Sequence, residues 1–329
     1  MEQEYQWMVR VSCMTYNHAP YITDALNGFC MQETTFPYVC VIVDDASTDG
    51  EQEVIKQYLQ EHFDLEDKSI VRNEETDDYI LTFARHKTNK NCYFAVLYLK
   101  YNHYSIKKSK APYLKEWQDK CKYIAACEGD DYWIHPRKLQ MQVDFLEKND
   151  EYGMVYTNYY ERIGDTIQNG KFRPVYNIED CLLKKGYIPT PTTLFRTSIY
   201  LQCDFSTKFL LGDLPIWAQI MHVSKIERLI DITTVYRILP ESASHSRDYE
   251  KRQTFIISTW EARKYFADKY GLTGVSKQLE KKVIMSKALL AFYQGKYMDY
   301  LRIKPWKYGP LNIKLLGKIM LKKLRIQLP

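Results

Sequence analysis

Two clusters of acids have residue types and a spacing that could do chemistry. Residues 128–131 read Glu-Gly-Asp-Asp and directly follow an apolar run, and the pair Asp44-Asp45 ends another apolar run. Neighbouring carboxylates repel one another and are costly to bury without a partner. Each cluster therefore needs a metal ion, a proton or water beside it.

Glu128 and Asp130 have a carboxylate-x-carboxylate spacing that can place both oxygens on one hard cation. Mg²⁺ and Mn²⁺ take a few carboxylates and complete their shell with substrate phosphates. Such an ion acts as a Lewis acid on a diphosphate leaving group. The alternative for the same residues is a solvated acidic turn.

Asp44 and Asp45 have two interpretations as well. Asp, Ser and Thr favour strand-to-helix turns, so the segment 44–49 could serve turn and capping chemistry alone. A carboxylate at a strand end is also a good acceptor for a ribose hydroxyl or a base N–H. The polar turn Thr15-Tyr16-Asn17-His18 follows an earlier apolar run in the same way.

The elements that would position these residues alternate along the first half of the chain. Apolar runs predict strands and helical spacing predicts helices, with strands at 8–16, 38–47, 68–73 and 121–127 and helices at 19–32, 49–63 and 136–149. This alternation favours an α/β fold with a mainly parallel sheet covered on both faces. Ligands bind beyond the carboxyl ends of such strands, where the acidic segments fall.

The remainder of the chain is less regular. Residues 74–121 are basic and aromatic without a clear period, and 228–239 resembles a last strand pair. A helix is expected at 211–223. After about residue 250 the pattern becomes that of long helices, at 250–270, 273–294 and 310–325.

Composition sets broad limits. The 329 residues are 45% hydrophobic and 26% charged with a net charge of +5, as in an ordinary globular protein with a mild basic bias. Eight scattered cysteines without a C-x-x-C pair indicate reduced thiols in a cytoplasmic protein, neither a zinc site nor a disulfide framework. The first residues lack a signal-peptide core, and no apolar run is long enough for a transmembrane helix.

Four motifs in order resemble the family 2 glycosyltransferases of bacteria. They read VSCMTYNHAPYITDALNGFCMQ, VIVDDASTDG, YIAACEGDDYW followed by KLQMQVDFLE, and LLGDLPIW. The resemblance runs from about residue 8 to 245. It implies a GT-A fold, which is Rossmann-like with a mixed, mainly parallel sheet flanked by helices, and an inverting enzyme that uses nucleotide-diphosphate sugars. We therefore expect a GT-A domain at 1–245 and a helical extension at 246–329.

The resemblance also assigns the donor-site residues. Thr15, Tyr16, Asn17, Asp44 and Asp45 match segments that hold the nucleoside. Glu128-Gly129-Asp130 matches the family's D-x-D motif, with Asp130 as the direct ligand of Mn²⁺ or Mg²⁺. Because Glu128 replaces an Asp, it could bind the metal or the ribose, and Asp131 could share either role.

Further residues follow from the same resemblance, and all but His245 also have a plainer alternative. Asp213 matches the catalytic base, although its place before Leu214-Pro215 also suits a helix N-cap. Trp217 would stack on the acceptor sugar or belong to the core. Three residues of the segment YNHYSIKKSK would contact the donor phosphates or sugar, or belong to a solvated basic loop: Asn102, Lys107 and Lys108. His245 would be a metal or phosphate ligand on a closing loop.

The expected function is transfer from a nucleotide-sugar donor, a UDP-sugar by family frequency, to a glycan or lipid-linked acceptor in surface-polysaccharide synthesis. The basic amphipathic segment 310–325 would dock peripherally on the anionic inner face of the cytoplasmic membrane, or simply pack on the main domain. Nucleic-acid binding is not expected from so small a net charge. A nucleotidyltransferase-like enzyme is disfavoured because no Gly-rich loop follows the first strand, and a non-catalytic sugar-nucleotide-binding protein because all the acids are present.

Overall fold

The computed structural model describes residues 5–170, 173–184, 186–206, 209–239 and 248–308, and these divide into two compact units. Met1–Asn177, Gly186–Cys203 and Val223–Ile238 form the first unit. Ile178–Lys185, Asp204–His222 and Leu239–Pro329 form the second. The domain boundary predicted at residue 245 stays a prediction, since 240–247 lie outside the described residues.

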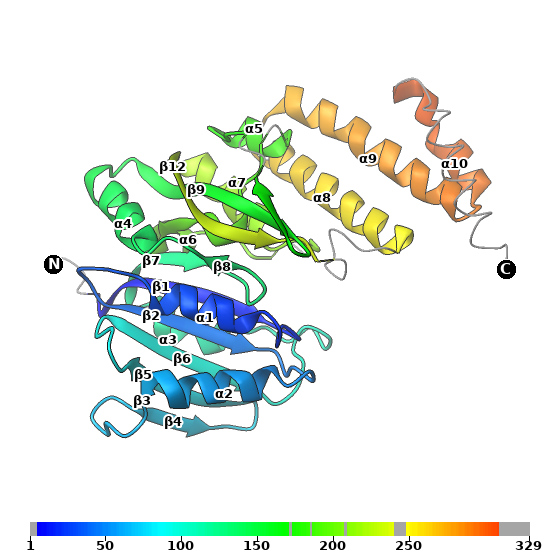
Figure 1. Cartoon of the computed structure of the whole chain (residues 1–329). Helices are drawn as coiled ribbons and strands as arrows, with labels where there is room; N and C mark the ends of the chain where they lie inside the picture. Colours follow the sequence, from blue (N-terminus) through cyan, green and yellow to red (C-terminus); the bar gives the residue numbers. More distant parts are fainter. Residues whose placement is uncertain (1–4, 171–172, 185, 207–208, 240–247, 309–329) are drawn as a thin grey trace. The chain divides into compact units, whose positions relative to one another are not determined.

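The first unit is built on one sheet whose central strands are parallel (Figure 1). In space their order is β6 (Cys92–Leu99), β2 (Tyr38–Asp44), β1 (Trp7–Thr15) and β7 (Cys121–Ala126). Every residue of β2 is buried, because neighbours lie on both sides of it and side chains cover both faces. Runs that are apolar throughout are typical of such doubly covered strands.

Helices cover the two faces of this sheet. α1 (Ile22–Cys30) and α2 (Glu51–His62) lie in front of the strands in Figure 1, and α3 (Ala111–Gln118) lies behind them. α4 (Lys138–Lys148) also contributes to the main core. Fully buried side chains from α1 and β1 meet in that core, among them Ile22, Leu26, Phe29, Val9 and Val11.

The third strand differs from the prediction. Within 68–73 only the last two residues are in a strand, β4 (Arg72–Glu75), which pairs antiparallel with β5 (Tyr79–His86) at the sheet margin. The parallel neighbour of β2 is β6, inside the segment that showed no period. Its sequence CYFAVLYL does not alternate because the strand is buried nearly throughout.

The other half of the sheet is mixed. β11 (Leu194–Arg196) runs antiparallel to β7 and to β9 (Tyr152–Ile163), and β9 is parallel to β12 (Lys225–Arg237). Where a last strand pair was predicted at 228–239, the chain forms this one long strand. Short elements complete the unit: β3 (Phe63–Asp64), β8 (Tyr132–Trp133), β10 (Thr166–Asn169), α6 (Thr197–Tyr200) and a 3₁₀ turn at Thr190–Thr192.

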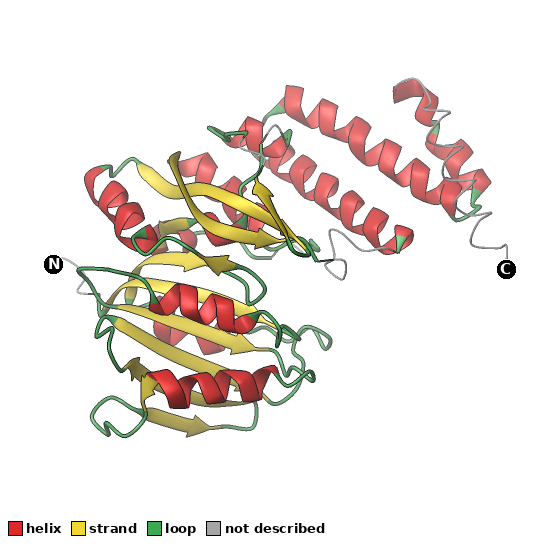
Figure 2. Cartoon of the chain, viewed as in Figure 1, coloured by secondary structure: helices red, strands yellow, loops and turns green. Residues whose placement is uncertain are grey.

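The second unit is helical (Figure 2). It contains α5 (Ile178–Leu182), α7 (Asp213–Val223), α8 (Tyr249–Lys269), α9 (Thr273–Tyr293), α10 (Tyr297–Ile303) and a 3₁₀ turn at Pro305–Tyr308. Leu182, Ala218, Phe266, Val275 and Leu279 pack together as its core. The predicted helices at 211–223, 250–270 and 273–294 are confirmed, whereas 310–325 lies outside the described residues. Among the helices that the structure describes, none combines the length and apolar character needed to cross a membrane.

Candidate functional site

The polar turns that follow β1, β2 and β7 meet at one edge of the first unit. In the parallel register Thr15 lies opposite Asp44, and Ser12 lies opposite Ala126. The carboxyl ends of these strands therefore bring residues 15–18, 44–49 and 128–131 together. Their proximity is a consequence of strand direction, as expected for ligand sites of open α/β sheets.

Glu51, at the start of α2, ties the first two turns to each other. The Thr15 hydroxyl donates to Oε1, while Oε2 accepts from the His18 backbone N–H at 2.9 Å and the Ser47 hydroxyl at 2.8 Å. Burial raises the pKa of this fully buried carboxyl. Sequence reasoning placed Glu51 only within a helix, although Thr48-x-x-Glu51 matches a capping-box pattern that could have drawn attention to it.

The turn after β1 is shaped by backbone conformation. Asn17 has φ of 57°, donates its N–H to the Ser47 hydroxyl at 2.9 Å, and accepts the Thr48 N–H on Oδ1 at 2.8 Å. Asn tolerates the left-handed region better than most residues. Its neighbour Tyr16 is 42% exposed, so its ring faces solvent beside the turn.

Asp44 and Asp45 have different surroundings. Oδ1 of Asp44 accepts from the Ser47 N–H at 3.0 Å and the Gln52 amide at 2.6 Å. Its Oδ2 is buried with no hydrogen-bond partner in the described part of the chain. A buried acceptor of this kind usually finds a donor in water or a ligand.

Both oxygens of Asp45 are engaged with the segment that follows β6. Oδ1 accepts from the His103 N–H at 2.8 Å, and Oδ2 from the Tyr104 N–H at 3.1 Å and the Lys110 ammonium at 2.8 Å. Asp45 thus fastens residues 101–110 to the end of β2. This segment contains three of the predicted donor-binding residues.

Those three residues are not equivalent. The Asn102 amide donates to the Asp45 carbonyl oxygen at 3.1 Å, and the Lys108 ammonium donates to Asp78 at 2.7 Å. Lys107 is exposed, at φ of 56°. Lys107 is therefore the better placed of the two lysines to meet a ligand without giving up an ion pair.

The turn at 128–131 packs tightly on β1. A Cβ on Gly129 would lie 2.1 Å from the Thr15 hydroxyl oxygen and 2.7 Å from the Thr15 Cβ, so only glycine fits. Asp130 keeps 20% of its side chain exposed, with Oδ2 4.0 Å from the His18 ring nitrogen Nε2. Asp131 is buried and accepts the Arg237 N–H at 2.7 Å. Burial, followed by the nearby Asp130 and Glu128, raises the pKa of Asp131 well above its ordinary value.

Arg237, at the end of β12, holds this turn in place. Its guanidinium donates to the Asp130 carbonyl oxygen at 2.5 Å and to the Asp24 carboxylate, and lies over the rings of Tyr21 and Tyr132. The sequence offered no motif by which to select it. An arginine buried between two aromatic rings and two acceptors has few alternative conformations, so it orients the acidic turn.

A divalent cation fits the residues present at this turn. Among the described residues no three His, Cys, Asp or Glu side chains are grouped to hold a metal ion. Mg²⁺ and Mn²⁺ need only one or two protein carboxylates when substrate phosphates complete the shell. Glu128 and Asp130, both partly exposed at the strand end, form such a set.

The remaining predicted residues belong to the second unit or lie outside the described residues. Asp213 begins α7, where its Oδ1 accepts the Leu214 N–H at 2.7 Å. Burial raises the pKa of Asp213, and the Leu214 N–H and the charge of Arg263 oppose that effect. Trp217 is 3% exposed within the same helix. His245 falls in the undescribed range 240–247.

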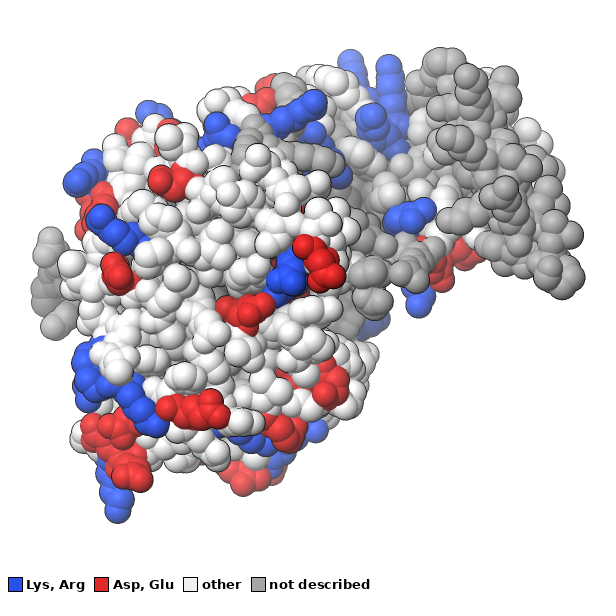
Figure 3. All heavy atoms as spheres, viewed as in Figure 1, with Lys and Arg blue, Asp and Glu red and all other residues white. Residues whose placement is uncertain are grey.

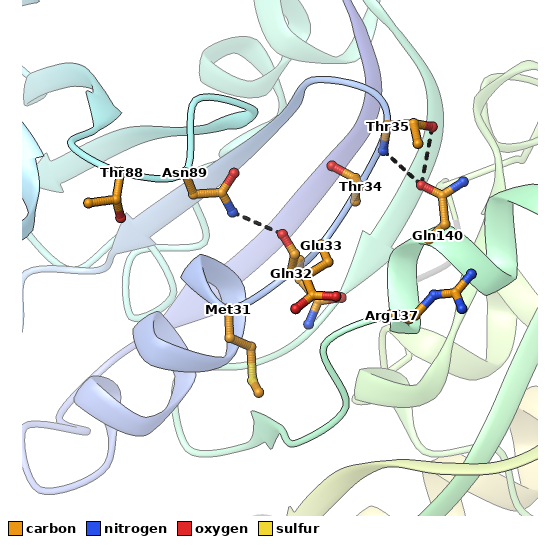
Figure 4. Close-up of a pocket in the computed structure, with 9 residues that line it drawn as sticks. All are labelled: Met31, Gln32, Glu33, Thr34, Thr35, Thr88, Asn89, Arg137 and Gln140. Atoms are coloured by element: carbon orange, nitrogen blue, oxygen red, sulfur yellow. Dashed lines mark hydrogen bonds between the residues drawn. The ribbon is translucent and has the colours of Figure 1, made fainter.

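A separate pocket of about 510 Å³ opens at the other edge of the sheet (Figure 4). Its lining comes from the segment before β2, the turn before β6 and the start of α4, and comprises Met31, Gln32, Glu33, Thr34, Thr35, Thr88, Asn89, Arg137 and Gln140. Those strands begin at this edge, opposite the acidic turns. The pocket therefore contains none of the predicted site residues.

The charges on the surface do not favour one sign. Figure 3 shows acidic and basic side chains interspersed over the visible face of the first unit. A nucleic-acid-binding face is expected to have Lys and Arg gathered in one patch, and the visible face of the first unit does not show such a patch.

Comparison with known proteins gives a family match and a fold match. Residues 12–97 match the family model described as Glycosyl transferase family 2. An uncharacterized protein of Mycobacterium tuberculosis (strain H37Rv) is 26% identical over 254 residues, covering 76% of this chain and 63% of its own length. An uncharacterized protein of Mycobacterium bovis matches to the same extent.

Two solved structures share the architecture. S. aureus TarS residues 1–349 in complex with UDP has a TM-score of 0.51 and 15% identity, over 96% of this chain and 88% of that one. The mannosyltransferase PcManGT from Pyrobaculum calidifontis in complex with GDP-Man and Mn²⁺ has a TM-score of 0.50 and 13% identity, over 98% and 91%. At 15% and 13% identity, the similarity to these two structures shows a shared fold alone. The chain spans 43% of the longer TarS chain in a further structure.

Proposed function

We propose that this chain transfers a sugar from a nucleotide diphosphate to a hydroxyl acceptor, because its residues 12–97 match the family model described as Glycosyl transferase family 2. One observation carries the proposal. The turns after three parallel strands, containing Thr15, Asp44 and Glu128–Asp131, converge on one edge of the sheet. A nucleoside needs hydrogen-bond acceptors and a diphosphate needs a cation, and this edge offers both kinds of partner.

The donor half of the site has separable roles. Asp44 Oδ2, which has no hydrogen-bond partner among the described residues, accepts a hydrogen bond from the nucleoside. The exposed Tyr16 ring packs on the nucleoside. Asp130 and Glu128 would hold Mn²⁺ or Mg²⁺ at the diphosphate. When bound, that ion supplies Lewis-acid stabilisation of the departing nucleoside diphosphate. We assign contacts with the phosphates or the donor sugar to Asn102 and to Lys107, which is exposed.

Asp213 is the base of the proposed reaction. Its carboxylate accepts the proton of the acceptor hydroxyl while that oxygen forms the bond to the anomeric carbon and the bond to the leaving diphosphate breaks. One such displacement inverts the anomeric configuration. Oδ1 already accepts the Leu214 N–H, so Oδ2 is the oxygen we assign to proton transfer. A raised pKa makes the carboxylate a stronger base than an ordinary Asp.

The finer assignments form part of the same proposal. The donor is a UDP-sugar, by its frequency in the family that the chain resembles, and the acceptor is a glycan or lipid-linked sugar of a surface polysaccharide. We assign Trp217 to the acceptor side and His245 to metal or phosphate binding. The enzyme works on the cytoplasmic side of a membrane, to which residues 310–325 attach it peripherally.

Calorimetric titration of UDP and GDP, with Mn²⁺ and with EDTA, tests the donor site. We expect UDP to bind with Mn²⁺ and to lose affinity in EDTA. Asp130→Ala should remove this metal-dependent part of the affinity. Asp150→Ala, which changes an acid that is 98% exposed, is the matched control and should behave as wild type. Absence of binding by either nucleotide under both conditions would overturn the proposal.

A further inference from the structure

The short helix α10 in the second unit exposes large apolar side chains. None of its seven residues is buried, and Tyr297, Met298 and Leu301 are 53%, 66% and 49% exposed. Residues three and four apart lie on the same face of a helix, so Leu301 shares a face with both of the others. Single exposed apolar residues are common at protein surfaces, whereas three on one face of so short a helix indicate a contact with another surface.

One side of α10 packs on α9, beside which it lies in Figure 1. The ring of Phe292 on α9 has its centroid 5.8 Å from that of Tyr297 and 5.5 Å from that of Tyr300. Ile303, three residues after Tyr300, is half-buried as Tyr300 is. This contact fixes which side of α10 is covered, and the side with Met298 and Leu301 is left to solvent.

Trp306 adds a fourth exposed apolar side chain just beyond α10. Lys304 ends the helix with φ of 50°, and the chain continues into the 3₁₀ turn Pro305–Tyr308. Within that turn Pro305 is buried, whereas Trp306 is 46% exposed. Four of the six tryptophans of the chain are 5% exposed or less, so the exposure of Trp306 is unusual here. We call the four exposed side chains the α10 set: Tyr297, Met298, Leu301 and Trp306.

The charges around the α10 set are mostly positive. The segment 296–307 contains four cations and a single acid, Asp299. Asp299 Oδ1 lies 3.5 Å from Arg302 Nη1, but the Arg302 side chain is 77% exposed, so this ion pair contributes little and leaves the guanidinium accessible. The other three cations are exposed as well: Lys296, Lys304 and Lys307.

These side chains together favour a membrane surface with negative charge as the partner. Trp and Tyr are enriched where the apolar and aqueous parts of a membrane meet, because their rings have an apolar body and a polar tip. Lys and Arg beside them attract anionic headgroups. A second copy of the chain is a poorer partner, because its cations would face those of the first copy.

We propose that the α10 set inserts into the headgroup region of a bilayer that contains anionic lipid, while the flanking cations contact the lipid phosphates. The insertion is shallow, because α10 remains packed on α9 and only its outer side chains enter the lipid. This contact adds to the attachment proposed for residues 310–325 and is argued from different residues. It does not require that the protein transfer a sugar.

Trp306 reports the insertion directly. The protein is mixed with phosphatidylserine-containing vesicles whose acyl chains carry bromine near the headgroup, which quenches tryptophan fluorescence only at short range. Wild-type fluorescence should be quenched, and Trp306→Phe should lose most of this quenching while still sedimenting with the vesicles. Phosphatidylcholine vesicles with the same label should quench much less. Vesicle binding without quenching, or equal quenching in Trp306→Phe, would overturn the proposal.

Co-sedimentation tests the helix itself. Met298→Ser with Leu301→Ser should weaken binding to phosphatidylserine-containing vesicles at least about tenfold, because two apolar side chains no longer leave water. Leu201→Ser with Leu210→Ser changes two leucines elsewhere that are 53% and 54% exposed, and this control should bind as wild type. Thermal unfolding checks that both variants are folded. No binding by wild type, or undiminished binding by the Met298 and Leu301 variant, would contradict the proposal.

Sedimentation velocity without lipid tests the alternative partner. We expect wild type and Met298→Ser with Leu301→Ser to have the same oligomeric state. A wild-type oligomer that this variant dissociates would assign the α10 set to a contact between copies and would exclude the membrane role. None of these measurements contains a nucleotide, so the membrane contact and the proposed function can each fail without the other.

Discussion

At the scale of single residues, the candidate site depends on one very close approach. Gly129 leaves no room for a Cβ against Thr15, whose hydroxyl is itself bonded to the buried Glu51. The acidic turn and the two polar turns beside it therefore share one rigid contact. A small change there should disturb both folding and ligand binding.

Gly129→Ala tests that contact. We expect the free energy of unfolding to fall by about 1–3 kcal/mol, as for other overpacked positions, and UDP affinity to weaken with it. Urea unfolding and calorimetry measure the two effects. Gly274→Ala is the control, because a Cβ there meets nothing within 4 Å and alanine favours a helix. A Gly129→Ala protein as stable as wild type would show that the turn can move away from Thr15.

Asp213 gives a second residue-scale prediction. Asp213→Asn should lower kcat by about 10²- to 10⁴-fold, because the amide cannot accept the acceptor's proton, while UDP affinity changes little. Nucleotide release measured against an acceptor panel, together with calorimetry, separates the two quantities. Glu179→Gln changes an acid elsewhere in the second unit and should retain full activity. Unchanged turnover in Asp213→Asn would mean that Asp213 is only the first residue of α7.

The pH profile follows from the direction of the Asp213 pKa shift. A base must be ionised, so activity is lost as the pH falls through its pKa. Because burial raises that pKa above 3.8, the acid limb of kcat should lie above the limb of an ordinary aspartate. An acid limb at or below pH 3.8 in a stable protein would contradict the assignment.

At the scale of elements, α4 is attached to the sheet by an unusual residue. Lys138 is fully buried, donates to Gln142 Oε1 at 2.7 Å and lies over the Trp133 ring, and burial lowers its pKa to about 7. The unfolded chain holds this proton up to about pH 10.5, so between the two values the unfolded state binds more protons. The contribution of Lys138 to the free energy of unfolding therefore rises with pH between about 7 and 10.5.

Lys138→Met should remove that dependence. We expect wild type to gain stability relative to Lys138→Met between neutral and alkaline pH, with Met filling similar volume. Urea unfolding at several pH values provides the comparison. Lys148→Met, at the exposed end of α4, should leave the wild-type slope unchanged. Parallel slopes for wild type and Lys138→Met would show that Lys138 is not buried as a neutral amine.

The elements also show what the sequence could predict. Apolar runs placed β1, β2 and β7, and apolar residues at helical spacing placed α1, α2 and α4. The same signals missed β6, an apolar run set within a basic and aromatic segment that has no overall period, and took 68–73 for a central strand. The order of the predicted parallel strands correctly placed the acids at one edge of the sheet. Glu51 and Arg237 were not predicted, because they act through contacts between segments that are distant in the sequence. No local pattern encodes contacts such as Arg237 with Asp24.

At the scale of the whole molecule, charge is distributed unevenly along the chain. Acidic and basic side chains are mixed on the visible face of the first unit (Figure 3). After Asp299, however, the sequence has eight Lys or Arg and no acid. Leu, Ile and Met alternate with these cations in the segment 310–325. Such a segment adsorbs to anionic lipid through its charges and its apolar side chains together.

The membrane proposal therefore predicts a dependence on where charge is removed. Lys322→Gln with Lys323→Gln should weaken binding to phosphatidylserine-containing vesicles by about 1 kcal/mol for each charge, measured by co-sedimentation. Lys148→Gln with Lys225→Gln removes the same charge from exposed positions of the first unit and should bind nearly as wild type. Equal weakening by both pairs would assign binding to net charge alone. Unchanged binding in the first pair, or none by wild type, would leave packing on the protein as the role of 310–325.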